Sequence, residues 1–188
     1  MKKSPDSFLK LFTVILILLI STFHLSAGEL NEVENSPGFW LNLGLGKSHF
    51  GPTLNTSMSY GFNKNLLILR YLSADEFRFN VEGHYDEPAL RVREIGLLYG
   101  KYILEKGVRL SLSAGVSYVH GVDRGNHLQF KEYERVNISA FGIPAELNVQ
   151  AEISRYFGFG FTAFGNFNNQ KSFYGGSIKL IFGKLGRN

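Results

Sequence analysis

The sequence contains no cysteine, only five prolines in 188 residues, and no long hydrophobic run. Without cysteine, disulfides and thiolate metal sites are excluded, so the fold must rest on burial and backbone pairing. The longest apolar run is Leu11–Ile20, well short of the ~20 residues that a membrane-spanning helix needs. The net charge is only +4 at pH 7, and no basic stripe with interleaved aromatic residues occurs. Nucleic-acid binding is therefore not expected.

The N-terminal residues have the order of a secretory signal peptide. Lysines come first, the apolar run Leu11–Ile20 follows, and the small residues Ser26–Gly28 come after it. This order of a positive segment, an apolar segment and small residues is the one that signal peptidase recognises. The sequence predicts a signal peptide over residues 1–27, cleaved after Ala27 or Gly28, and a flexible lead-in over residues 28–37.

Glycine (21 residues), phenylalanine (17) and tyrosine (9) are abundant, and from Gly38 onward apolar residues alternate with small polar ones. A period of two is typical of β-strands, and Leu110–Tyr118 (LSLSAGVSY) is the clearest example. Eight such segments occur, with longer loops after the first, third, fifth and seventh, and short turns after the others. The longest loops, 73–93 and 121–135, are charged. We predict an all-β fold: an eight-stranded antiparallel up-and-down transmembrane β-barrel domain over residues 38–188, with the short turns in the periplasm.

Each predicted strand has an apolar face and an opposite face, and the composition of the opposite face predicts which of the two points out of the barrel. That face consists mostly of Gly, Ser, Thr and Asn, and a soluble barrel would instead carry many charges on its exterior. The strands contain few charged residues, and all share this face: Arg70, Arg109, Glu146 and Lys179. We therefore predict that the apolar face points outward to lipid and that the small polar face lines the lumen. A soluble, lipocalin-like periplasmic ligand-binding barrel is the alternative.

Aromatic residues near the strand ends are candidates for the interfacial rings of such a barrel, although aromatic residues also favour strands in general. The tyrosine candidates are Tyr60, Tyr71, Tyr99, Tyr118, Tyr156 and Tyr174.

The strand pattern over residues 38–182, together with Phe141–Val149 (FGIPAELNV) and Ser177–Leu185 (SIKLIFGKL), resembles the small outer-membrane β-barrel family of Gram-negative bacteria, which includes the OmpA transmembrane domain and OmpX-like proteins. The resemblance implies a location in the bacterial outer membrane. It also implies outer-membrane lipids, lipopolysaccharide and the outer-membrane insertion machinery as partners, and a monomer. One difference is that many family members end on an aromatic residue, whereas here Phe182 is followed by six more residues.

No pattern predicts a catalytic, cofactor or metal site. After residue 27 no histidine has a serine two positions later, as in the lipid A deacylase family, and His49, His84 and His127 have no metal-ligand spacing. Only His120, with Ser117 and Asp123 nearby, could form a catalytic group. We therefore expect a non-enzymatic protein with a structural or surface-interaction role through loops 73–93 and 121–135. An outer-leaflet lipid-modifying enzyme, acting on lipid A acyl chains, is the alternative. A small pore is disfavoured because side chains fill an eight-stranded interior.

Overall fold

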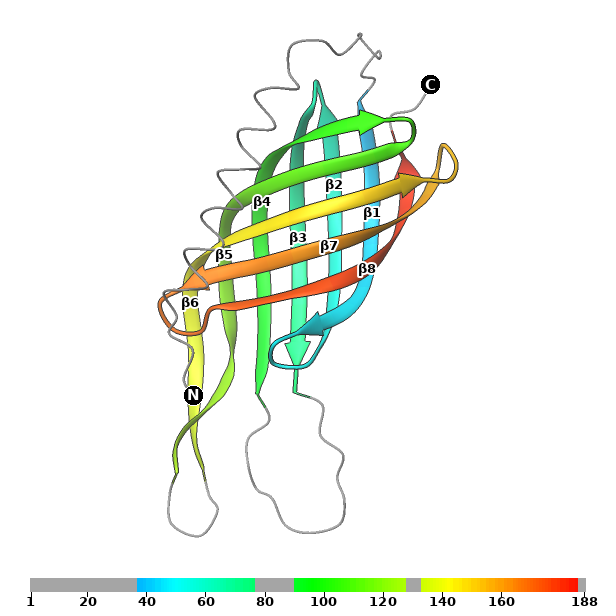
Figure 1. The fold of residues 1–188 in the computed structure, drawn as a ribbon. Coiled ribbons are helices and arrows are strands. Elements are labelled where there is room, and N and C mark those ends of the chain that lie inside the picture. Colours follow the sequence, from blue (N-terminus) through cyan, green and yellow to red (C-terminus); the bar gives the residue numbers. More distant parts are fainter. Residues whose placement is uncertain (1–36, 77–89, 128–132, 186–188) are drawn as a thin grey trace, which may run out of the picture. The chain divides into compact units, whose positions relative to one another are not determined.

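The computed structural model describes residues 37–76, 90–127 and 133–185, which form a closed barrel of eight antiparallel strands (Figure 1). Each strand pairs with its neighbour in the chain, and β1 also pairs with β8. The predicted eight-stranded up-and-down barrel is therefore confirmed. The predicted signal peptide and all of the lead-in except Pro37 lie outside the described residues. The strands are β1 (Gly38–Ser48), β2 (Pro52–Phe62), β3 (Asn65–Asp75), β4 (Arg91–Glu105), β5 (Val108–His127), β6 (Tyr133–Glu152), β7 (Phe157–Asn168) and β8 (Phe173–Lys184).

The described parts of the chain contain no helix that is long and apolar enough to cross a membrane.

Three short turns lie at one end of the barrel, which we name the turn end. The turns 63–64, 106–107 and 153–156 occupy the predicted positions. Asn63 and Lys64 both have positive φ (46° and 63°), as a two-residue hairpin turn requires for its twist to match that of the strands. Lys106 and Gly107 adopt the same kind of conformation (49° and 82°). The opposite end, with the other four connections, is named the loop end.

Two of the predicted longer loops are in fact short. The connection between β1 and β2 is 49–51, and that between β7 and β8 is 169–172. The Asn168 side chain closes the second, since its Oδ1 accepts hydrogen bonds from the backbone N–H groups of Gln170 and Lys171. The strands beside these two connections extend further than the apolar alternation indicates. Their last residues lie at the polar rim of the barrel, where outward side chains need not be apolar. Of the predicted loop 73–93, residues 73–75 and 91–93 belong to strands, and residues 77–89 lie outside the described residues.

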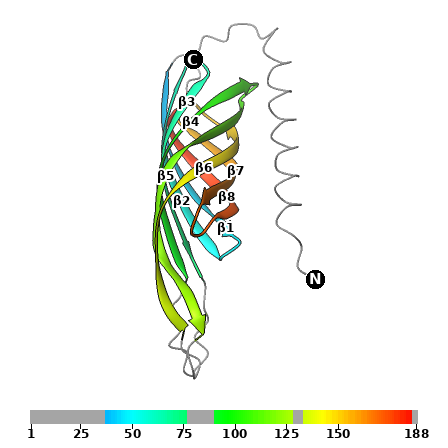
Figure 2. The same cartoon turned by 90° about the vertical axis from the view of Figure 1, so that its left-hand side faces the viewer.

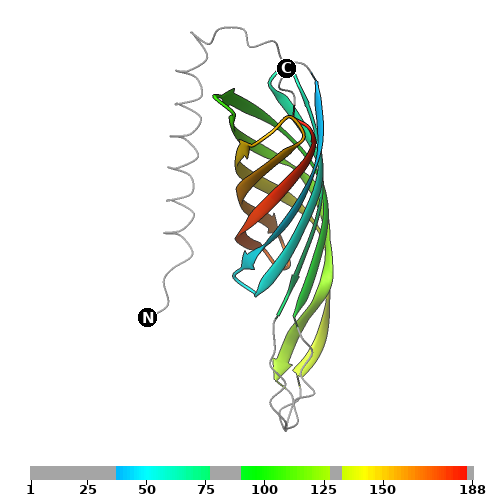
Figure 3. The ribbon, with the colours of Figure 1, turned by 90° about the vertical axis from the view of Figure 1, so that its right-hand side faces the viewer.

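The predicted loop 121–135 is wrong over most of its length. β5 continues to His127 and β6 begins at Tyr133, with pairs that include Gly121↔Ile138 and Asp123↔Val136. We name this two-stranded extension, Gly121–His127 with Tyr133–Ile138, the ribbon. Figures 2 and 3 show that it extends past the other strands at the loop end. Beyond Val122, the last residue of β5 that pairs with β4, the ribbon has left the barrel wall. Residues 134–137 on its other strand are all exposed, so this sequence lacks the apolar alternation that would identify a strand.

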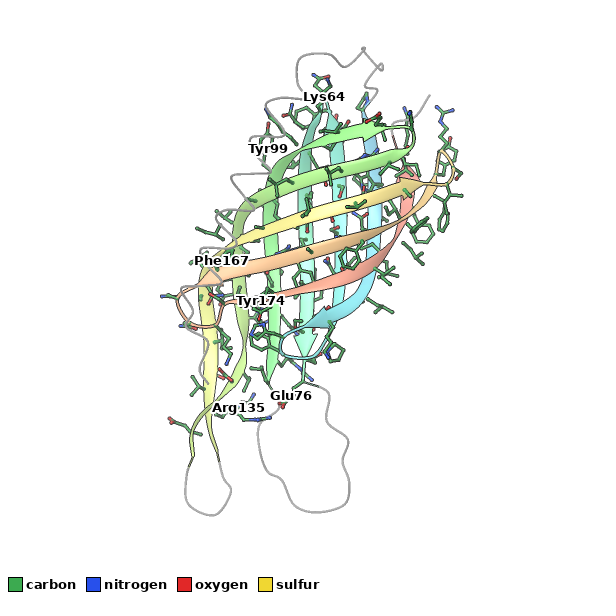
Figure 4. The ribbon with its side chains drawn as sticks, viewed as in Figure 1. Lys64, Glu76, Tyr99, Arg135, Phe167 and Tyr174 are labelled. Carbon is green, nitrogen blue, oxygen red and sulfur yellow. The ribbon has the colours of Figure 1, made fainter. Side chains whose placement is uncertain are left out.

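Large apolar side chains cover the outside of the barrel, as predicted. Phe141 is 83% exposed and Leu45 is 70% exposed, while polar side chains such as Asn55 and Thr162 are fully buried inside. This arrangement is the reverse of a soluble, lipocalin-like barrel, so that alternative is wrong. All six candidate tyrosines point outward. Tyr60, Tyr99 and Tyr156 lie toward the turn end, and Tyr71, Tyr118 and Tyr174 toward the loop end; Figure 4 labels one of each group, Tyr99 and Tyr174.

Glycines on the inner face make room for large neighbours. A Cβ atom at Gly61 would lie 3.0 Å from Cη2 of Trp40, and one at Gly44 would lie 2.8 Å from Cγ of Lys179. The small inner face that the sequence predicts therefore accommodates a few large side chains within a narrow lumen.

The exposed apolar wall predicts that a new charge lowers the free energy of unfolding by an amount that depends on the position of the charge. Val116→Arg places a charge on the outer face between Ala114 and Tyr118, and we expect it to lower the free energy of unfolding by about 2 kcal/mol or more. Val136→Arg, on the ribbon, is the matched control and should cost less than about 1 kcal/mol. Denaturant unfolding of the barrel in lipid vesicles measures both. Equal costs at the two positions would contradict a lipid-facing wall.

Candidate functional site in the lumen and at the loop end

Four charged side chains from four strands meet in the centre of the lumen. Arg70 of β3 donates through Nε to Oε1 of Glu94 at 3.0 Å and through Nη1 to Oε2 of Glu146 at 3.2 Å. Lys179 of β8 places its Nζ 3.9 Å from the same Glu146 oxygen. All four side chains are at most 1% exposed. Two positive and two negative groups thus compensate one another, which offsets their loss of water.

Amide and hydroxyl side chains extend this network on both sides. Asn166 Nδ2 donates to Oε2 of Glu94 at 3.0 Å and to Oγ of Ser117 at 2.7 Å. Asn148 Nδ2 donates to Oε1 of Glu146 at 2.8 Å, and its Oδ1 accepts from the Thr162 hydroxyl. The carboxylates therefore have hydrogen bonds in addition to their ion pairs, as buried charges require.

The sequence identified Arg70, Glu146 and Lys179 as inward charges but missed Glu94. Glu94 lies at the end of a run of charged residues that reads as a loop, so its place on a strand was hidden. Once β4 is known to extend to Arg91, the inward direction of Glu94 follows from the alternation with the outward Ile95, and the register pairs it with the inward Leu72 and Val119.

A second buried arginine closes the turn end. Arg109 Nη2 lies 2.6 Å from Oε1 of Glu152 and also donates to the carbonyl oxygen of Leu185. Its guanidinium carbon lies 4.1 Å from the ring centre of Trp40 and 5.1 Å from that of Tyr102. Together these contacts offset part of the cost of burying the arginine. The surrounding apolar cluster consists of Trp40, Leu66, Ile68, Leu98, Tyr102, Ile181 and Leu185.

The residues after Phe182 complete this cluster. Gly183 has a φ of +135°, and its N–H donates to the Tyr156 carbonyl at 3.0 Å. The chain then turns so that Leu185 is fully buried. The non-aromatic ending, which the sequence marks as a difference from many family members, thus supplies an apolar plug for the lumen.

A second apolar cluster closes the loop end. It contains Leu72, Ala74, Val92, Val119, Ile138, Phe164 and Phe173, with Phe50 and Leu90 packed against it. Among the described residues the lumen therefore has a polar centre and an apolar cluster toward each end, with the Arg109–Glu152 ion pair against the cluster at the turn end. Buried side chains thus fill the described lumen, which argues against the small pore.

The three residues that could have formed a catalytic group do not meet. Ser117 points into the lumen and is bound by Asn166, whereas His120, an odd number of residues away, lies on the outer face and stacks on Tyr118 with ring centres 6.1 Å apart. Asp123 is paired with Lys171 at 2.5 Å. A serine and a histidine on opposite faces of one strand cannot exchange a proton directly.

The other histidines also show no metal site. Burial lowers the pKa of His49, whose ring stacks on Tyr174 with centres 4.7 Å apart. His84 and the side chain of His127 lie outside the described residues. Within the parts of the chain that the structure describes, no group of three His, Asp, Glu or Cys side chains could hold a metal ion.

Ion pairs at the loop end fasten the base of the ribbon. Glu76, directly after β3, pairs with Arg124 of the ribbon and accepts the Leu90 N–H at 3.3 Å. On the other side, Lys171 of the β7–β8 connection binds Asp123 of the ribbon. The hydrogen bond from Arg124 lowers the pKa of the Glu76 carboxyl. The ribbon is thus held at its base from both sides.

No protein-family profile and no curated protein matches the chain in sequence. Among solved structures, the barrel is similar to the N-terminal β-barrel domain of Pseudomonas aeruginosa OprF, at 11% identity and a TM-score of 0.55, over 78% of this chain and 96% of that one. It is also similar to Ail, the attachment invasion locus protein of Yersinia pestis (9% identity, TM-score 0.53, 79% and 97% covered). A third similar structure is Neisserial surface protein A (NspA), with 12% identity and a TM-score of 0.50, over 79% of this chain and 94% of that one. The chain has the fold of the small eight-stranded outer-membrane β-barrels.

The central network predicts a strong coupling between Glu146 and Lys179. Glu146→Gln leaves Lys179 buried without its carboxylate, and we expect a loss of about 3 kcal/mol in the free energy of unfolding. Lys179→Met in the same chain removes this uncompensated positive charge, leaves the Arg70–Glu94 pair in place, and should restore at least half of that loss. Urea unfolding in vesicles measures both, with the exposed Glu105→Gln as a control for the charge change. Strictly additive losses would show that the two groups do not interact.

The Glu76 contacts predict an acid-dependent change at the base of the ribbon. A carboxyl whose pKa is lowered by folding stabilises the folded form above its ordinary pKa of 4.5, and this contribution disappears as the pH falls through the lowered value. The NMR shift of the Leu90 amide should therefore stay constant from pH 7 to 5 and change only below 4.5. Glu76→Gln should abolish the transition, and a midpoint above 4.5 would contradict the pairing.

Proposed function

We propose that the protein is an integral outer-membrane barrel with a structural or surface-interaction role, oriented with its turn end in the periplasm and its loop end outside the cell. The observation that carries this proposal is the apolar outer wall between two groups of outward tyrosines. Tyrosine has an apolar ring and a polar hydroxyl, so it favours the two interfaces of a bilayer. The wall therefore matches a membrane and the two ends match water.

The ribbon is the surface that supports an interaction role. Glu134, Arg135, Val136 and Asn137 are all exposed on it, and ion pairs to Glu76 and Lys171 fasten its base. A fastened strand pair presents side chains in fixed positions, which lowers the ordering cost of binding. We place the interaction here and in the connection between β3 and β4.

The same proposal covers catalysis, the oligomeric state and the partners of the protein. It is non-enzymatic, because Ser117 and His120 face opposite sides of the wall. Closure of all eight strands within one chain supports a monomer, since no second copy is needed to cover an edge. The surrounding lipids and lipopolysaccharide are its immediate partners, and the outer-membrane insertion machinery assembles it.

The absence of cysteine allows a direct test of orientation. We expect Asn137→Cys, on the ribbon, to react with a membrane-impermeant maleimide on intact cells, and Glu105→Cys, at the turn end, to react only after lysis. A folded barrel resists detergent, so a difference in gel mobility between unboiled and boiled samples checks that each variant has folded. Labelling of Glu105→Cys alone on intact cells would reverse the orientation, and a soluble protein without a mobility shift would refute the membrane location.

A further inference from the structure

The outer face of β3–β6 changes from apolar to polar at the same step along each strand. The last apolar row on this face is Tyr71, Ile95, Tyr118 and Phe141, which pair side by side. The next outward row toward the loop end is Ser73, Arg93, His120 and Ser139. In a membrane barrel this change marks the height of the lipid headgroups, so Arg93 lies at the headgroup boundary.

Arg93 has no counterion in the described parts of the chain. Its neighbours in the row, Ser73 and His120, are not carboxylates, and its Nε is buried with no hydrogen-bond partner there. The nearest carboxylate on the same face, Asp75, is bound by Arg91 at 2.9 Å. Arg93 is half-buried and has no counterion among the described residues, so the exposed part of its guanidinium is available to an anion from outside the chain.

A second arginine on this face is also unmatched. Arg135 of β6 lies directly opposite Arg124 of β5. Like charges opposite one another destabilise a strand pair, and Arg124 already holds Glu76. Arg135 is exposed, and no described carboxylate pairs with it. In Figure 4, Arg135 and Glu76 lie beyond Tyr174 and Phe167 toward the loop end.

We propose that the outer face of β4–β6 at the loop end binds the phosphate groups of membrane lipids in the surrounding leaflet. Arg93 binds at headgroup height and Arg135 binds farther from the bilayer. This inference rests on the proposed function, because only a membrane-spanning barrel places Arg93 beside headgroups.

Two features favour a lipid phosphate over a dissolved anion. The face adjoins the apolar row that contains Ile95 and Tyr118, so a ligand here must also tolerate an acyl-chain environment. The planar guanidinium group of arginine also matches the oxygens of a phosphate with two parallel hydrogen bonds.

Native mass spectrometry of the purified full barrel in uncharged detergent tests the proposal. The probes are diphosphorylated lipid A and the same lipid with its phosphates removed. A basic residue near anionic headgroups contributes about five-fold in affinity, so Arg93→Gln and Arg135→Gln should each weaken phosphorylated lipid binding about five-fold, and the double variant about twenty-five-fold. Arg155→Gln, an exposed arginine at the turn end, is the matched control and should leave binding unchanged.

Three results would overturn the proposal. The first is equal binding of the dephosphorylated lipid, and the second is unaltered binding by the double variant. The third is full competition by inorganic pyrophosphate, which would assign the arginines to a dissolved anion. The gel mobility shift, measured on every sample, separates failure of this inference from failure of the proposed function. A barrel that shows the shift but binds both lipids equally refutes this inference alone. A protein without the shift refutes the proposed function.

Discussion

Every backbone hydrogen bond in the membrane-spanning wall must be made within the sheet, because hydrocarbon offers no partner for an amide or carbonyl group. The pairing of β1 with β8 satisfies this constraint by removing both free edges. The seam is tight: a Cβ atom at Gly46 would lie 2.0 Å from the carbonyl oxygen of Gly176, which leaves no space for a side chain. Glycine at this position therefore serves the closure on which the rest of the barrel depends.

Closure with eight strands determines the lumen in turn. The interior is only wide enough for side chains, so small residues must alternate with the few large ones that fill it. Charges enclosed there cannot reach water and must compensate one another, as Arg70, Glu94 and Glu146 do. Arg109 is compensated differently, by Glu152 and by the faces of Trp40 and Tyr102. The same narrowness lets side chains fill the described part of the lumen.

The features that sequence alone predicts are those that the membrane imposes. Alternation along segments such as Leu110–Tyr118 gives the strands and their faces, and turn residues such as Asn63 give the short connections. The outer part of the ribbon was hidden because its consecutive residues 134–137 are all exposed, which gives no apolar alternation. Glu94 was hidden by the charged run before it. The plugging role of Leu185 depends on a bend at Gly183 and on Arg109, which is distant in sequence, so no local pattern could reveal it.

The lipid-facing wall and the filled lumen follow from burial and pairing, so they would be similar for many functions. Departures from those rules are more informative. A sheet built only for stability would avoid Arg135 opposite Arg124, and would give Arg93 a carboxylate neighbour such as the one that Arg91 has in Asp75. Both departures lie on one outward face: Arg93 at the height where apolar side chains end, and Arg135 farther toward the loop end. Their cost is removed if the membrane itself supplies the anion, which makes the surrounding lipid part of the structure at the loop end.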